Sequence, residues 1–120
     1  MSQQFSKQPI LEITVQELAS RLIDGIPEKL QLVDVRELSE IKIAYLKGFK
    51  VLPLSKFPEW SEQIHFHLDS NQETLVLCHH GMRSAQMCQW LENQGFTNVK
   101  NIIGGIDNYS LVVDKSIPRY

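Results

Sequence analysis

The sequence predicts an α/β fold with a central, mostly parallel five-stranded sheet flanked by helices. Apolar segments of strand length alternate along the chain with segments of helical periodicity. The apolar segments lack the polar alternation of a half-exposed sheet, as in Leu75-Val76-Leu77, which indicates strands buried on both faces. The 120 residues are enough for one hydrophobic core but too few for two.

Five short apolar segments are expected to form the strands. They are bounded by polar or turn-forming residues, such as Pro53 after the third segment. The first is a short edge strand at Ile13. The others cover residues 30–35, 49–52, 74–77 and 98–103.

Capping and helix-breaking residues locate the helices between these strands. Thr14-Val15-Gln16-Glu17 has the pattern of a capping box, which opens a helix. Pro58 is compatible with the first turn of a helix, and Gly95 suits a helix end. We predict a flexible N-terminus at residues 1–9 and a single domain at residues 10–120. The predicted helices cover residues 14–22, 38–44, 55–64, 84–94 and 104–111.

Composition and charge argue against several classes of protein. The net charge of -2 gives no support for binding to nucleic acid or to a membrane surface. The sequence has no run of about 18 apolar residues that could span a bilayer, and residues 1–9 lack the apolar core of a signal peptide. The two cysteines are too few for a disulfide framework and suit a reducing compartment. We therefore expect a cytoplasmic protein, and we expect it to be a monomer.

Residues 75–91 are the most informative segment for function. An apolar run ends at Cys78, a helical pattern starts near Ser84, and Gly81 and Arg83 lie between them. The cysteine sulfur is then expected over a tight loop and a helix N-terminus, where free N–H groups and the helix dipole concentrate positive potential. That environment favours the thiolate, the reactive form of cysteine. The alternative is an inert buried cysteine at a strand end, but Gly81 permits an anion-binding curl of the backbone and Arg83 adds charge.

Four segments, in this order along the chain, resemble the rhodanese (sulfurtransferase) family. The resemblance covers roughly residues 13–109 and implies a rhodanese-like layered fold. Residues 113–120 are similar to the tail of some single-domain rhodaneses, and to rhodanese domains fused to enzymes that activate sulfur-carrier proteins. The four matching segments are Leu32-Val33-Asp34-Val35-Arg36-Glu37, residues 48–53, Cys78-His79-His80-Gly81-Met82-Arg83-Ser84 and Gly104-Gly105-Ile106-Asp107.

The resemblance implies a role for each residue of the central segment. Cys78 would take a sulfane sulfur from a donor such as thiosulfate, become a persulfide, and pass the outer sulfur to a thiol or protein acceptor. Arg83 would hold the anionic donor, in bidentate fashion where that donor is an oxyanion. Backbone N–H groups of the active-site loop would stabilise the anionic sulfur. This loop comprises His79, His80, Gly81, Met82 and Ser84. No cofactor is implied.

Two further segments are expected to support the loop. Asp34 and Arg36 follow a buried strand, where they form a strand-end pair that caps the next helix. The resemblance adds a second interpretation, in which Asp34 holds Arg83 or a loop N–H, and both interpretations can be true. Gly104 and Gly105 would let the backbone approach the site closely, or would simply form a tight strand-to-helix turn.

The remaining candidates are assigned structural roles. Because His79 and His80 are adjacent in a curled loop, we expect them to point in different directions, one at the pocket mouth and one beneath the loop. A metal site at Cys78, His79 and His80 is disfavoured because neighbouring side chains in a tight loop rarely converge, so we expect no metal. Cys88 lies in the helical pattern after the loop, and we expect it to pack in the core.

Three functional hypotheses follow. The first is a sulfurtransferase enzyme. The second is a phosphatase or arsenate reductase of the related cysteine-loop type, ranked low because such loops usually have one residue more than the four between Cys78 and Arg83. The third is a persulfide carrier or regulatory module that serves a protein sulfur donor or acceptor.

Overall fold

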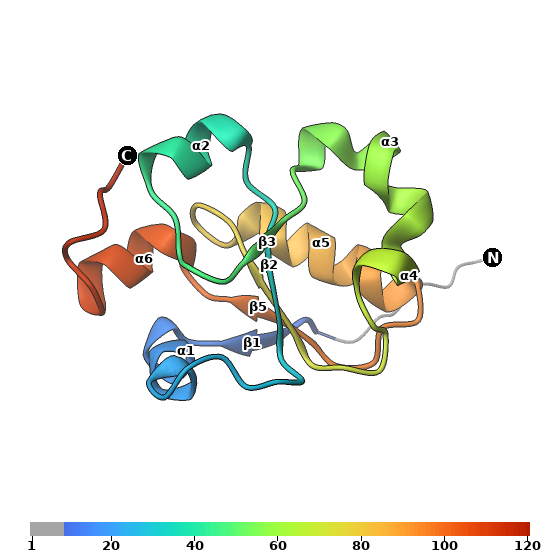
Figure 1. The fold of residues 1–120 in the computed structure, drawn as a ribbon, viewed down its shortest axis with the longest axis horizontal. Helices are drawn as coiled ribbons and strands as arrows, with labels where there is room; N and C mark the ends of the chain where they lie inside the picture. Colours follow the sequence, from blue (N-terminus) through green and yellow to red (C-terminus); the bar gives the residue numbers. More distant parts are fainter. Residues whose placement is uncertain (1–8) are drawn as a thin grey trace.

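The structure, a computed structural model, describes residues 9–120. Its five strands form one sheet in the order β1-β5-β4-β2-β3, and every pairing is parallel. Figure 1 shows the helices α1 and α5 on opposite sides of strands β1 and β5. This confirms the predicted α/β fold with a five-stranded sheet flanked by helices. The predicted flexible N-terminus lies outside the described residues, apart from Pro9. The strands are β1 (Leu11–Ile13), β2 (Gln31–Asp34), β3 (Lys50–Val51), β4 (Thr74–Leu77) and β5 (Val99–Ile102).

The helices begin and end close to the residues that the sequence indicated, with one exception. The predicted capping box is present, because the Thr14 side chain accepts the Glu17 N–H at 3.0 Å and the Glu17 carboxylate accepts the Thr14 N–H at 2.9 Å. The helices are α1 (Val15–Leu22), α2 (Leu38–Ile43), α3 (Phe57–Trp60), α4 (Ile64–His67), α5 (Met82–Asn93) and α6 (Gly105–Val112).

The exception is the helix predicted over residues 55–64, which is wrong as a continuous element. This segment consists of two short α-helices, α3 and α4, alternating with 3-10 turns at Leu54–Lys56 and Ser61–Gln63. Pro58 has no N–H to donate to the carbonyl of Leu54, and that carbonyl instead accepts the Phe57 N–H in a 3-10 bond. The tighter turns wrap the segment around the core.

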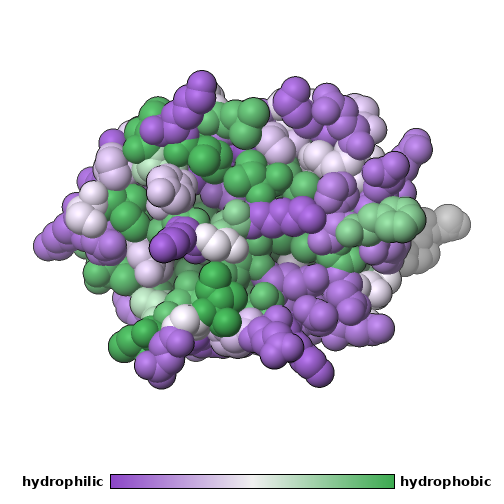
Figure 2. Space-filling view, in the orientation of Figure 1, coloured by the Kyte–Doolittle hydropathy of each residue, from purple (hydrophilic) through white to green (hydrophobic). Residues whose placement is uncertain are grey.

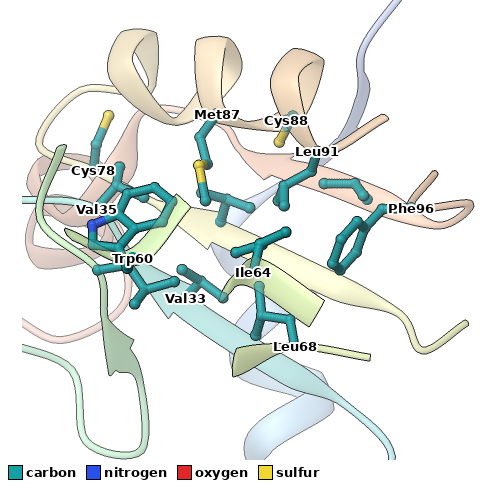
Figure 3. Close-up of a cluster of buried hydrophobic side chains, with 13 residues drawn as sticks. Val33, Val35, Trp60, Ile64, Leu68, Cys78, Met87, Cys88, Leu91 and Phe96 are labelled. Atoms are coloured by element: carbon teal, nitrogen blue, oxygen red, sulfur yellow. The ribbon is translucent and has the colours of Figure 1, made fainter. Parts of the chain in front are cut away.

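The sheet separates two apolar cores, because successive residues of a strand point to opposite faces. Leu32 and Leu75 pack in the core that contains residues of α1 and α6. Val33 and Val76 pack in the other core, against residues of α3, α4 and α5 (Figure 3). Because the strands are parallel, their carboxyl ends lie at one edge of the sheet, where α/β proteins place their ligand-binding sites.

The surface of residues 9–120 combines charged regions with exposed apolar side chains. On the face shown in Figure 2, hydrophobic residues gather over α2, where Leu38 and Ile43 are about half exposed. Among the helices of this part of the chain, none is long and apolar enough to span a membrane.

Candidate active site

Cys78 lies directly after β4, which has a strand on either side and four buried residues. The loop that follows is short, because α5 begins at Met82 rather than near Ser84 as the sequence suggested. Gly81 is the residue before the helix and has a φ of 100°, a left-handed conformation that glycine adopts readily. Arg83 therefore belongs to the first turn of α5.

The sulfur of Cys78 has two hydrogen-bonding neighbours. The Gly81 N–H donates to Sγ at 3.0 Å, and the Ser84 hydroxyl oxygen lies 3.2 Å from Sγ. Cys78 is 1% exposed and Ser84 is fully buried, so both contacts are shielded from water. Dipoles fixed in a dry environment stabilise charge on the sulfur more effectively than mobile water would.

Arg83 is held by Glu40 of α2, a residue that the sequence analysis did not single out. Arg83 Nη1 lies 2.7 Å from Glu40 Oε1, and Nη2 lies 2.9 Å from Oε2. The Arg83 hydrogen bonds lower the pKa of Glu40 to about 2, and Glu40 in turn raises the pKa of Arg83 above its ordinary value. The fork expected to bind a donor oxyanion in bidentate fashion is thus already occupied by a carboxylate.

Asp34 and Arg36 form a closed, buried ion pair, so the expectation that Asp34 holds Arg83 or a loop N–H is wrong. Arg36 Nη2 lies 2.8 Å from Asp34 Oδ2, and both side chains are almost fully buried. Arg36 also donates to the Ala44 carbonyl at 2.9 Å, which fixes the end of α2. The pair thus caps the C-terminal end of α2, as expected of a strand-end pair, but not its start. The Glu40 carboxylate accepts the N–H of Glu37, the residue before that helix.

Gly105 allows the close approach that was predicted for Gly104 and Gly105, whereas a Cβ on Gly104 would meet the Asn108 side chain. A Cβ on Gly105 would lie 2.4 Å from the carbonyl oxygens of both Cys78 and His79. Those two carbonyls accept the backbone N–H groups of Ile106 and Asp107 at 2.9 and 3.1 Å. The N-terminus of α6 thus anchors the beginning of the Cys78 loop.

The two loop histidines do not point in different directions, which corrects that expectation. Their ring centroids lie 3.8 Å apart, and His79 also stacks on Tyr120 at 3.9 Å with an angle of 5° between the rings. His79 is half-buried, and its pKa is lowered by burial and by the neighbouring His80. His80 is exposed and lies 3.8 Å from an Asp107 oxygen. Aromatic stacking overrides the alternation expected of adjacent side chains.

Tyr120 connects several of these groups and was not identified from the sequence. Its hydroxyl accepts from Arg36 at 2.9 Å and donates to Glu40 at 2.8 Å, while its ring covers His79. Burial raises the pKa of Tyr120 to about 12, which keeps the hydroxyl a donor at neutral pH. The end of the described chain therefore ties the Asp34–Arg36 pair to the Glu40–Arg83 pair.

The other candidates lie where their sequence context suggested. Met82 opens α5 and is 77% exposed beside the loop. Cys88 is fully buried in the core, as predicted, and burial raises the pKa of its thiol to about 12 (Figure 3). Within residues 9–120, no three His, Cys, Asp or Glu side chains gather where they could hold a metal ion.

Comparison with known proteins agrees with this architecture. A family profile described as "Rhodanese-like domain" matches residues 14–111. The chain is 49% identical over 115 residues to Rhodanese-like/PpiC domain-containing protein 12, chloroplastic, of Arabidopsis thaliana, covering 95% of this chain but only 38% of that protein. It is 32% identical over 80 residues to the thiosulfate sulfurtransferase GlpE of Vibrio cholerae, covering 67% of this chain and 72% of that protein.

A solved structure shows the same fold. The crystal structure of SSP1007 from Staphylococcus saprophyticus superposes with a TM-score of 0.72 at 29% identity, covering 92% of this chain and 100% of that one. The fold and the cysteine loop define a rhodanese-type α/β domain. This chain belongs to the rhodanese-like family. The name of the Arabidopsis relative assigns that protein to the chloroplast, and the cytoplasmic location expected for this chain stays a prediction.

Proposed function

We propose that this protein is a sulfurtransferase that moves a sulfane sulfur through a persulfide on Cys78 to a thiophilic acceptor. The observation that carries the proposal is the placement of Cys78 Sγ. It lies at the start of α5, 3.0 Å from the Gly81 N–H and 3.2 Å from the Ser84 hydroxyl. The name of the Vibrio cholerae relative, a thiosulfate sulfurtransferase, supports the reaction class.

The first half-reaction loads the sulfur. The Cys78 thiolate attacks the sulfane sulfur of thiosulfate and forms a new S–S bond. The S–S bond of thiosulfate breaks, and sulfite leaves with the electron pair. Negative charge on the attacking Cys78 Sγ is stabilised by the Gly81 N–H and by the Ser84 hydroxyl when that group donates.

The second half-reaction unloads the sulfur. A thiolate or another thiophilic acceptor attacks the outer sulfur, the S–S bond of the persulfide breaks, and the Cys78 thiolate is regenerated. The cycle needs no outside oxidant or reductant. Arg83 supplies the cationic charge at the site, through the N–H groups that Glu40 leaves free.

A second candidate is a persulfide carrier or regulatory module that exchanges sulfur with a protein. The chain spans only 38% of the length of its Arabidopsis relative, and this favours a domain that works beside others. Turnover with thiosulfate would support the enzyme, whereas turnover only with a protein donor would support the carrier.

Mass spectrometry of the intact protein tests the persulfide directly. After exposure to thiosulfate, the wild type should gain the mass of one sulfur atom, and peptide mapping should place that sulfur on Cys78. Cys78→Ser should gain none while keeping the wild-type circular dichroism. Cys88→Ala is the matched control and should load like the wild type. An unmodified wild type, or sulfur located on Cys88, would reject the proposal.

A further inference from the structure

Asn101 of β5 contacts both residues that contact the sulfur of Cys78. Its side-chain amide nitrogen donates to the Gly81 carbonyl at 3.0 Å, and its side-chain oxygen lies 2.5 Å from the Ser84 hydroxyl oxygen. Asn101 is 5% exposed and comes from the strand next to β4. One buried side chain thus fixes both hydrogen-bonding neighbours of the sulfur without touching the sulfur.

The orientation of the Asn101 amide follows from the Gly81 carbonyl. A carbonyl oxygen only accepts hydrogen bonds, so the atom that faces it is the amide nitrogen of Asn101. The amide oxygen must then face Ser84, and this oxygen also only accepts. Ser84 therefore has an acceptor on one side and the sulfur of Cys78 on the other.

The Ser84 hydroxyl carries a single hydrogen for these two neighbours. When Cys78 is a thiol, its S–H donates to the Ser84 oxygen, and the Ser84 hydrogen goes to Asn101. When the sulfur is an anion, it has no hydrogen to donate, and the Ser84 O–H is needed at the sulfur. The buried oxygen of Asn101 then loses its donor, which is unfavourable.

We propose that Asn101 is a positioning residue of the Cys78 site that governs the charge state of the sulfur through Ser84. It holds the Ser84 hydrogen while the sulfur is a thiol and gives it up when the sulfur is an anion. The hydrogen stays on the Ser84 oxygen throughout, and only the direction of its hydrogen bond changes. The inference rests on Cys78 being the reactive sulfur of the proposed function.

Replacing Asn101 with an apolar residue leaves the charged and titratable groups around Cys78 unaltered. They are His79 in the loop, Arg83 and Cys88 on α5, and Glu40 of α2, which pairs with Arg83. At the end of β2, the buried Asp34–Arg36 pair is linked to Glu40 through the Tyr120 hydroxyl. A shift in the titration of Cys78 on removal of the uncharged Asn101 side chain would therefore report on the hydrogen bond.

The test is an ultraviolet absorbance titration of the Cys78 thiolate, with Cys78→Ser as the blank. Asn101→Leu frees the Ser84 hydrogen for the sulfur, so the titration should move to lower pH, with a roughly threefold larger thiolate fraction at a given pH. Ser84→Ala removes the hydrogen and should move the titration to higher pH. In the double variant, Asn101→Leu should have no further effect, because no hydroxyl hydrogen remains to redistribute.

A second substitution keeps the test decisive if Asn101→Leu does not fold. Asn101→Val also removes the acceptor from Ser84, adds no charge and suits a strand, so its titration should move to lower pH like that of Asn101→Leu. Asn98→Leu, at a half-buried position just before β5, is the matched control and should titrate like the wild type. Shifts of Asn101→Leu and Ser84→Ala in the same direction, or an Asn101→Leu effect that persists without Ser84, would overturn the inference. The titration needs no sulfur transfer, so this result is independent of the proposed activity.

Discussion

Glu40 and Arg83 form a two-pronged ion pair that joins α2 to the first turn of α5. Both terminal nitrogens of the guanidinium contact the carboxylate, at 2.7 and 2.9 Å, and the Tyr120 hydroxyl donates to the same carboxylate. The cation beside Cys78 is therefore partly neutralised by its own protein. Under the proposed function, an anionic donor has to share Arg83 with Glu40.

Glu40→Gln should lower the KM for thiosulfate by about fivefold, because the amide keeps the shape of the carboxylate but releases the charge of Arg83. Steady-state kinetics with varied thiosulfate would measure this. Glu59→Gln, on the exposed part of α3, is the control and should leave KM unchanged. An increased KM would mean that Glu40 holds Arg83 in the geometry that binds the donor.

Arg83→Ala should act in the opposite direction and raise the KM for thiosulfate more than it lowers stability. The guanidinium lies at the helix start and is about one-third exposed, so its removal leaves no large cavity. Arg83→Lys should restore only part of the loss, because an ammonium ion lacks the planar fork. Kinetics combined with urea unfolding would separate the two effects. An unchanged KM in Arg83→Ala would remove Arg83 from donor binding.

Gly105→Ala should destabilise the fold and slow sulfur transfer, because its Cβ would meet two carbonyl oxygens of the Cys78 loop at 2.4 Å. Gly95→Ala is a matched control, since Gly95 also has a positive φ but nothing lies within 4 Å of an added Cβ. Gly95→Ala should cost about 1 kcal/mol from backbone strain alone, and Gly105→Ala should cost more than about 2 kcal/mol. Urea unfolding of both variants measures the difference. Equal losses in the free energy of unfolding would show that the close approach of Gly105 to the Cys78 loop does not affect stability.

The sequence predicted a helix or strand correctly where the local residue pattern and the packing of the whole fold favour the same structure. The apolar run Leu75-Val76-Leu77 and the capping box at Thr14 each determine a nearby element, whatever the rest of the chain does. The helix predicted over residues 55–64 was wrong as one element, because Pro58 lacks the N–H that a helix continuous from Ser55 would need at that position.

The sequence predicted only part of the candidate site, because several side chains that contact the site residues come from distant segments of the chain. Cys78, Gly81 and Ser84 lie within one loop and the helix after it, so their proximity follows from their sequence spacing. Glu40 reaches Arg83, and Tyr120 reaches His79, only through the packing of α2 and the chain end. Asn101 could have been identified from the sequence, because a polar residue in a buried strand needs hydrogen-bond partners.

Cys88→Ala should leave sulfur transfer nearly unchanged and cost roughly 1 kcal/mol of stability, as expected for a small buried apolar group. Burial raises the pKa of the Cys88 thiol to about 12, so this thiol stays protonated at neutral pH and is a poor nucleophile. Activity assays of the variant test the prediction for sulfur transfer, and urea unfolding tests the prediction for stability. A large loss of rate with normal stability would instead identify Cys88 as a second sulfur relay.

Stability should fall in acid, partly because of Glu73. This carboxylate accepts from Arg21 at 2.6 and 2.7 Å and from Lys100 at 2.7 Å, which lowers its pKa from 4.5 to about 2. Because the folded pKa lies below the unfolded value, the contribution is complete above about pH 5 and is lost as the pH falls toward 2. Folding therefore loses this stabilisation on acidification.

Glu73→Gln should flatten this acid dependence, because the amide does not titrate. The difference in the free energy of unfolding between pH values of about 6 and 3 should shrink by about 1 kcal/mol or less, since Arg21 and Lys100 are partly exposed and solvent screens their charges. Urea unfolding at both pH values measures the difference. Glu62→Gln, at an exposed position in the second 3-10 turn, is the control and should retain the wild-type dependence. An acid dependence as steep in Glu73→Gln as in the wild type would show that other groups, and not this ion-pair cluster, set the acid limit of the fold.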